Sequence, residues 1–305
     1  MRAAVRRVAT GVVVLWVAAT AAYVALLAAP GDTVDSIVGD GADTPAIRAQ
    51  IIAEWHLDRP VVVQYLDYLW RAAHGDLGRS YLLQRPVRDV LGEQVGPTLQ
   101  LAACAAALGV LLALILAVTT RRAWARRASS TTELVLVSTP PFLIGIVLLS
   151  VFSFRFGWFP VSGAGGAVAL VLPAVTLALP IAGVLTQVLR DGLDRALDEP
   201  FALTARARGL RENAVLVRHA LRHALLPAVT LTGWLFGILL GGAVIIEQVF
   251  GRPGLGQVTL QAVSSQDMPV VLAVVTLSAF VYVLLNTAAD LAYVVIDPRL
   301  RGGRA

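Results

Sequence analysis

Runs of uncharged, mostly apolar residues alternate with charged connections along the whole chain. Each run exceeds about 18 residues, the length that an α-helix needs to cross the hydrocarbon core of a bilayer. The first run is longer than the apolar core of a secretory signal peptide, so we interpret it as an uncleaved helix. The pattern predicts an all-α membrane protein with six transmembrane helices. The predicted spans are 8–29, 98–120, 134–154, 167–189, 224–246 and 268–289.

Arginines are concentrated in alternate connections between these spans. The chain has 25 basic residues, and all of them are arginine. Seventeen of the 25 lie in the segments 1–7, 121–133, 190–223 and 290–305. Because arginines near span ends are retained on the cytoplasmic side of a membrane, we predict that both termini are cytoplasmic.

The first connection on the opposite side, 30–97, is too long for a simple hairpin. Pro45 and Pro60 each suit the first turn of a helix, and apolar side chains recur at helical spacing from Ile47 to Trp55. We expect short amphipathic helices there, which either receive an external partner or cover the helix bundle. The predicted division is an N-terminal end with the first helix (1–29), an extracytoplasmic helical connection (30–97) and a core with five helices (98–305).

The composition excludes most soluble and catalytic functions. Charged residues make up 15% of the chain and the mean hydropathy is +0.74, whereas about a quarter of the residues of a soluble domain are charged. The absence of lysine excludes a P-loop ATPase. The predicted spans contain no histidine, aspartate or glutamate, so we predict no catalytic residues, no metal site and no cofactor in this chain. The same absence disfavours an ion-coupled secondary carrier.

Prolines and glycines mark several of the predicted spans. Proline frees backbone carbonyls and glycine permits close helix approach, and both are tolerated where neighbouring helices or a wet cavity compensate. A bundle with an internal path fits this pattern, and ordinary helix packing is the alternative. Glu247 lies just beyond the fifth span, and the alternative for it is a solvated position at the membrane interface. The candidate pathway or gate residues are Pro140, Pro141, Gly145, Gly241, Gly242 and Glu247.

The connection 190–223 has the pattern of a small helical element outside the bilayer. Pro200 can start a helix and Gly209 can stop it. Small side chains at Ala205 and Gly209, four positions apart, would let this helix fit closely into a groove of another protein. Alternatively, the helix lies on the lipid surface and is held by anionic headgroups.

Several ordered motifs resemble the permease subunits of bacterial ABC importers of the dipeptide, oligopeptide and nickel group, specifically the first of the two permeases. The resemblance covers nearly the whole chain. The sharpest motif is GDLGRSY at 75–81, and the connection 190–223 contains TARARGL at 204–210 with a leucine-proline pair at 226–227. The other matching runs are PFL at 141–143, GWFPVSG at 157–163, LPA at 172–174, EQVF at 247–250, PGLG at 253–256 and DPR at 297–299.

The resemblance implies a MetI-like permease fold of type I ABC importers in the bacterial cytoplasmic (inner) membrane. It implies a second homologous permease, two ATP-binding cassette subunits that hold ATP and magnesium, and an extracytoplasmic substrate-binding protein, besides membrane lipid; no nucleic acid is expected. The expected cargo is a short peptide, with nickel or another small solute as the alternative. A membrane receptor without transport is a further alternative.

The same resemblance identifies a coupling helix that docks into a cleft of an ATPase subunit. The implied ATPase-coupling residues are Thr204, Ala205, Ala207, Arg208, Gly209 and Leu210. Arginine replaces the family's lysine at Arg208, which keeps the charge. Two further departures are Thr186, where the family commonly has arginine, and His223, where it commonly has asparagine.

Overall fold

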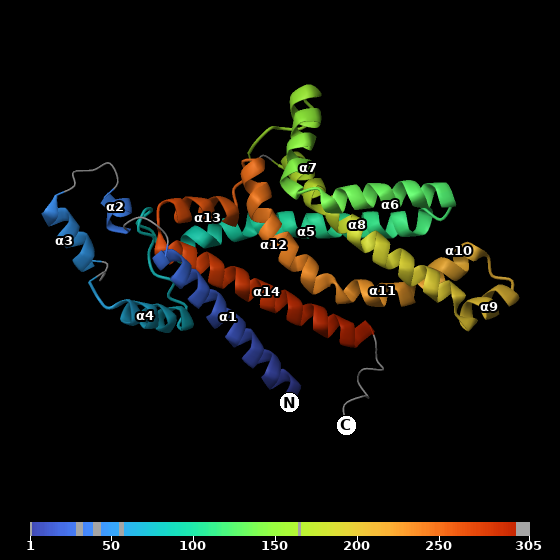
Figure 1. Cartoon of the computed structure of the whole chain (residues 1–305), viewed down its shortest axis with the longest axis horizontal. Coiled ribbons are helices and arrows are strands. Elements are labelled where there is room, and N and C mark those ends of the chain that lie inside the picture. The colour runs from blue at the N-terminus through green and yellow to red at the C-terminus, as the bar shows by residue number, and fades with distance from the viewer. Residues whose placement is uncertain (1, 29–32, 39–43, 55–57, 164–165, 297–305) are drawn as a thin grey trace. The chain divides into compact units, whose positions relative to one another are not determined.

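The structure is a computed structural model, and it describes residues 2–28, 33–38, 44–54, 58–163 and 166–296. These residues are almost entirely helical (Figure 1). Extended pairing within them is limited to one isolated bridge between Arg79 and Pro86. The elements are α1 (Arg2–Ala28), α2 (Thr33–Val38), α3 (Pro45–Glu54), α4 (Val61–Ala73), α5 (Val87–Thr119), α6 (Ala123–Ser138), α7 (Pro141–Leu148), the π-helical η1 (Leu149–Arg155), α8 (Val168–Asp198), α9 (Pro200–Ala207), α10 (Glu212–Val215), the π-helical η2 (Leu216–Ala220), α11 (Leu221–Thr230), α12 (Thr232–Val249), α13 (Leu255–Ser264) and α14 (Met268–Ile296).

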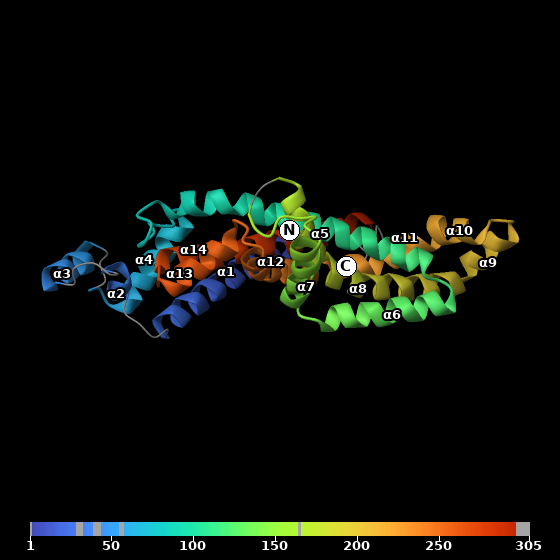
Figure 2. The ribbon, with the colours of Figure 1, turned by 90° about the horizontal axis from the view of Figure 1, so that it is seen from above.

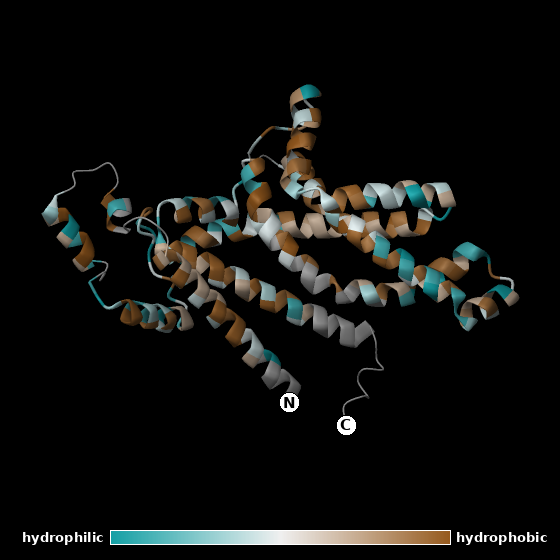
Figure 3. Cartoon of the chain, in the orientation of Figure 1, coloured by the Kyte–Doolittle hydropathy of each residue, from teal (hydrophilic) through white to brown (hydrophobic). Residues whose placement is uncertain are grey.

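Four helices among the described residues are long and apolar enough to cross a membrane, namely α1, α5, α8 and α14. They confirm four of the predicted spans as apolar helices, although α5 and α8 extend well beyond the predicted ends. Apolar residues cover most of α1 and α14, whereas hydrophilic residues are frequent in α9 and α10 (Figure 3).

The predicted span at 134–154 is not one continuous helix. The structure breaks it into α6 and the pair α7–η1, which meet at an angle of 106°. The break lies at Pro140 and Pro141, because neither proline has a backbone N–H to continue the ladder of α6 and the second one starts α7. Counting this bent pair as one crossing raises the number of candidate spans to five.

The predicted span at 224–246 is divided as well. It begins within α11 and continues as α12, with Leu231 between the two helices. Pro227 of the leucine-proline pair lies inside α11. Within this span, the apolar helix is the shorter segment Gly237–Val249, which is less than the 18 residues that a crossing needs. The described residues therefore do not establish a sixth crossing.

The chain folds as two compact units, and the first comprises residues 1–98 and 253–283. Its two core clusters join helices that are far apart in sequence. Tyr68 of α4 packs with Tyr23 of α1 and Leu272 of α14, and the Tyr68 hydroxyl lies 2.9 Å from Thr276 Oγ1. Pro45 begins α3 and Pro60 caps α4, which confirms the predicted helix starts. The short helix α2 was not predicted, and Trp55 lies outside the described residues.

The second unit comprises residues 99–252 and 284–305, and α8 supplies much of its core. Close approach to α8 depends on glycine at several positions. A Cβ atom on Gly192 would lie 2.9 Å from Ala224 Cα of α11, and one on Gly183 would lie 2.9 Å from a methyl group of Val137 in α6. Helices α6 and α11 therefore pack directly on the backbone of α8, as Figures 1 and 2 both show.

Candidate functional site

The segment that follows α8 folds as an ordered helical element. Helix α8 ends at Asp198, and Pro200 occupies the first turn of α9. Gly209 adopts a φ of +80°, a left-handed conformation that glycine takes without strain, just after α9 ends. The predicted start and stop of this helix are both confirmed. Because α8 is continuous to Asp198, the element extends directly from the longest helix of the second unit.

One face of α9 is turned into its own chain. Ala202 and Ala205 are 0% and 7% exposed and belong to the core cluster around α8. The expectation that the small side chain of Ala205 fits into another protein is therefore wrong, because Ala205 packs within this chain. Leu210 is half-buried against the same cluster.

The opposite face of α9 is exposed. It consists of residues at the surface of the second unit, including Leu203 at 63% exposure. A Cβ atom on Gly209 would meet no atom within 4 Å, so the surface is not closed there. We call this surface the α9 face; its residues are Leu203, Thr204, Ala207, Arg208 and Gly209.

Polar and aromatic contacts hold the α9 face in place. Arg206 Nε donates to Glu212 Oε1 of α10 at 2.7 Å, and a second guanidinium nitrogen donates to the Leu197 carbonyl of α8 at 3.2 Å. The hydrogen bond from Arg206 lowers the pKa of Glu212. The Phe201 ring stacks on His223 of α11 with centroids 4.8 Å apart. His223, which departs from the family's asparagine, thus takes part in packing α9.

A buried ion pair that the sequence pattern did not predict joins α8 to α6. Arg190 of α8 donates to both carboxylate oxygens of Glu133 in α6, at 2.8 and 3.2 Å. It also donates to Thr120 Oγ1, Ser129 Oγ and Ser130 Oγ at 2.9–3.1 Å. The two charged side chains are 6% and 2% exposed. The sequence pattern assigned both residues to charged connections, where a solvated position is the usual expectation.

The candidate pathway residues lie on α7, on α12 and at the bend before α7. Gly145 lies in a close contact of α7 with two helices, since its Cβ would be 3.3 Å from Thr176 of α8 and 3.2 Å from the Phe250 ring. A Cβ atom on Gly242 of α12 would lie 3.0 Å from a methyl group of Leu177 in α8. These two glycines thus bring α7, α8 and α12 together. By contrast, a Cβ on Gly241 would meet nothing within 4 Å.

Glu247 is buried rather than solvated. Its side chain lies near the C-terminal end of α12 and is 0% exposed, which corrects the solvated alternative for this residue. Arg252 is also buried, at 4% exposure, and its backbone N–H donates to the Glu247 carbonyl at 2.9 Å. Pro140 and Pro141 lie at the bend between α6 and α7.

The first unit carries its own ordered polar loop. Asp267, at 2% exposure, accepts hydrogen bonds from the Ser80 hydroxyl at 2.5 Å and from the backbone N–H groups of Tyr81 and Leu82 at 3.1 and 3.2 Å. This carboxylate fixes the GDLGRSY loop to the start of α14. Burial and the Asp267 carboxylate raise the pKa of Tyr81 to about 12, so the phenol stays protonated at neutral pH.

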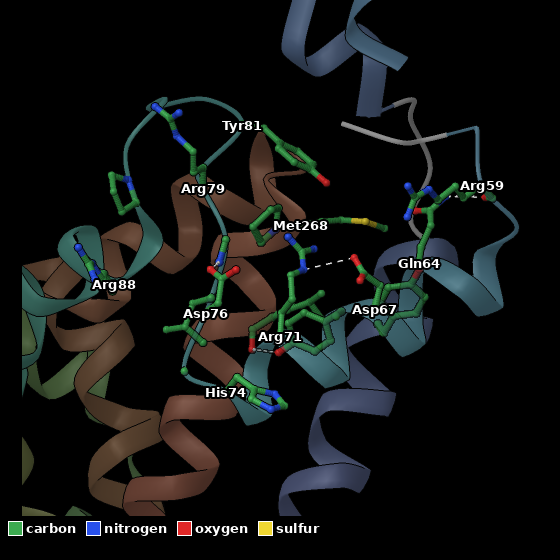
Figure 4. Close-up of a pocket in the computed structure, with 18 of the residues that line it drawn as sticks. Arg59, Gln64, Asp67, Arg71, His74, Asp76, Arg79, Tyr81, Arg88 and Met268 are labelled. Atoms are coloured by element: carbon green, nitrogen blue, oxygen red, sulfur yellow. Dashed lines mark hydrogen bonds and ion pairs between the residues drawn. The ribbon is translucent and has the colours of Figure 1, made fainter. Parts of the chain in front are cut away.

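A cavity of about 820 Å³ adjoins this loop (Figure 4). Its wall carries charges of both signs. Arg71 and Asp67, both from α4, face each other at 3.3 Å, while Arg79 and Tyr81 come from the loop and Met268 from the start of α14. Among the described residues, no group of histidine, cysteine, aspartate and glutamate could hold a metal ion.

Comparisons with known proteins cover nearly the whole chain. Residues 109–302 match the family described as binding-protein-dependent transport system inner membrane component. A Brucella abortus (strain 2308) protein named as a peptide transport system permease is 36% identical over 97% of this chain and 98% of its own length. The glutathione transport system permease protein GsiC of Escherichia coli (strain K12) is 35% identical over 89% of this chain and 90% of its own.

A solved structure resembles the fold. A chain from the crystal structure of an amino acid ABC transporter with histidines superposes with a TM-score of 0.53 at 17% identity. The superposition covers 67% of this chain and 93% of the solved chain. At this identity the likeness concerns the helical architecture alone.

Proposed function

The chain belongs to the family of binding-protein-dependent transport system inner membrane components, and on this premise we propose that it forms half of the translocation pathway of an ATP-driven importer for short peptides. It is an inner-membrane permease of the ABC transporter class. Relatives named for peptide and for glutathione transport support a short peptide as cargo. Nickel or another small solute is the alternative within the family.

We further propose that ATP hydrolysis takes place on two separate ATPase subunits. A phosphate-binding P-loop needs a lysine, and the chain has none. The remaining partners in the proposal are a second homologous permease, which completes the pathway, and an extracytoplasmic substrate-binding protein, which delivers the cargo. ATP and magnesium belong to the ATPase subunits.

The proposed topology has six crossings with both termini in the cytoplasm. In this proposal the bent α6–α7–η1 segment forms the third crossing, and α11 with α12 forms the fifth. The distribution of arginine supports the orientation, because seventeen of 25 lie in the four connections assigned to the cytoplasm. The α9 face then lies on the cytoplasmic side, where ATPase subunits are found.

The observation that carries the coupling proposal is the construction of α9. One face of this helix is buried in the core around α8, and the other, which includes Leu203, is exposed. Arg206 and Phe201 fix its orientation toward α10 and α11. A helix held in this way transmits a push from a docked partner to α8. We propose that closure of the ATPase subunits on ATP moves both permeases and reopens the pathway to the outside.

Replacing Ala207 by tryptophan tests this role without disturbing the core, because Ala207 is exposed on the α9 face. A large ring there blocks close docking, and we expect ATP-dependent peptide uptake to fall at least about tenfold, the effect of about 1.4 kcal/mol of lost binding. The measurement is uptake of labelled dipeptides and of glutathione by proteoliposomes that contain the complete transporter.

The matched control is Ala123→Trp, at an exposed alanine of α6 outside the α9 face. It should leave uptake nearly unchanged, and both variants should reach the membrane at the level of the native chain. Normal uptake by Ala207→Trp would refute docking through the α9 face. Loss of uptake without any loss of bound ATPase would assign Ala207 a role other than docking.

A further inference from the structure

A groove opens between α5, α6 and α8 in the second unit, apart from the α9 face. Its volume is about 480 Å³, within the range of about 300–1,000 Å³ typical of small-molecule sites. Gly183 and Ala182 of α8 line it where α6 packs on the backbone of α8. We call it the α5–α6–α8 groove; its lining residues are Leu112, Leu116, Thr120, Trp124, Ala125, Ala128, Ser129, Thr132, Glu133, Leu136, Leu179, Ala182 and Gly183.

The groove is apolar at one end and polar at the other. Leu112, Leu136 and Leu179 come from positions distant from the turn that joins α5 to α6. Thr120 and Trp124 lie at that turn, and the Trp124 side chain is 71% exposed. A tryptophan at such a boundary is typical of the membrane interface. The groove therefore suits an amphiphilic ligand whose polar head lies at the turn.

The charges near the polar end favour an anionic head. Glu133 lines the groove, but Arg190 donates to both of its carboxylate oxygens and neutralises it. Exposed arginines follow at the turn and along the first part of α6. Arg122 and Arg127 form no ion pair among the residues that the structure describes, whereas the charge of Arg121 acts on the Glu212 carboxylate and helps to lower its pKa. Exposed arginines close to a membrane attract an anionic lipid surface.

We propose that the α5–α6–α8 groove binds one phospholipid with an anionic headgroup. An acyl chain lies between Leu116 and Leu179, and the phosphate lies at the turn beside Arg121 and Arg122. The proposal does not depend on the cargo or on the docking of an ATPase.

The test is photolabelling of the complete transporter in phosphatidylcholine nanodiscs. Two lipid probes carry a diazirine in the acyl chain, one with a phosphatidylglycerol head and one with a phosphatidylcholine head, and mass spectrometry locates the labelled peptides. We expect the phosphatidylglycerol probe to label the segments 112–120 and 179–183 several-fold more than the phosphatidylcholine probe does. The Arg121→Gln and Arg122→Gln double variant should remove that difference.

Ala128→Trp fills the groove from an exposed position of α6 and should reduce labelling of both segments several-fold. Its matched control, Ala123→Trp, is an exposed alanine of the same helix outside the groove and should not. Equal labelling by both probes would overturn recognition of an anionic head. Absence of label from both segments, with label on other apolar helices, would show that a protein partner covers the groove and would overturn the proposal.

Discussion

Replacing Arg190 by alanine is expected to destabilise the chain by about 3–5 kcal/mol, the usual cost of removing one partner of a buried ion pair. The Glu133 carboxylate, at 2% exposure, would lose both of its hydrogen bonds from Arg190. Thr120 and Ser130 would lose the same donor. The junction of α5, α6 and α8 should therefore loosen. Titration with a denaturing detergent, followed by circular dichroism, measures the effect.

Two further variants separate this explanation from a general loss of charge. Arg126→Ala removes a pair with Asp194 whose side chains are 44% and 42% exposed, and we expect a cost of about 1 kcal/mol or less. Replacing Arg190 and Glu133 together by methionine removes both buried charges and should recover most of the lost stability. An equal cost for Arg126→Ala and Arg190→Ala would contradict the structural role of the buried pair.

The second large effect is expected at Gly192, where α8 and α11 are in backbone contact. A Cβ atom there would lie 2.9 Å from Ala224 Cα and 3.1 Å from Ala224 Cβ. A helix backbone cannot move aside as a flexible side chain can, so Gly192→Ala should separate the two helices at a cost of about 1–3 kcal/mol. Unfolding in the same detergent titration reports this cost.

Gly241→Ala is the opposite case and serves as the control. Its Cβ would meet no atom within 4 Å, and Gly241 lies inside α12. Alanine stabilises a helix interior by about 0.5–1 kcal/mol relative to glycine. We therefore expect Gly241→Ala to be neutral or stabilising. Equal destabilisation by Gly192→Ala and Gly241→Ala would contradict the contacts that the structure gives these two glycines.

The sequence predicts the apolar helices well because each one needs a long uncharged run. It predicts the ends poorly, since α8 continues beyond 189 as a helix that buries Arg190. A hydropathy pattern records how polar a residue is and not whether a partner neutralises it. Glu133 and Arg190 were therefore assigned to solvated connections, although they pair at the ends of adjacent predicted spans. The opposite charges of Glu133 and Arg190 were the feature of the sequence that could have predicted their pairing.

The coupling segment shows the same limit. Pro200 and Gly209 act through local backbone geometry, so their sequence pattern predicts the start and the end of α9 correctly. Ala205 and Ala207 have the same side chain, and only the packing of α9 on α8 distinguishes the buried one from the exposed one. The two prolines at 140 and 141 indicate a break in the third predicted span. They do not indicate the angle of the bend.

The most direct measurement of the central claim is cross-linking from the α9 face to an ATPase subunit. In a Cys104→Ala background, the Leu203→Cys variant carries a benzophenone attached to its thiol in the complete transporter. The control is Leu82→Cys, at an exposed residue just after the GDLGRSY motif. The account predicts a covalent product between Leu203→Cys and an ATPase subunit and none from Leu82→Cys. Absence of that product while the ATPase remains bound, or its appearance from Leu82→Cys alone, would contradict the account.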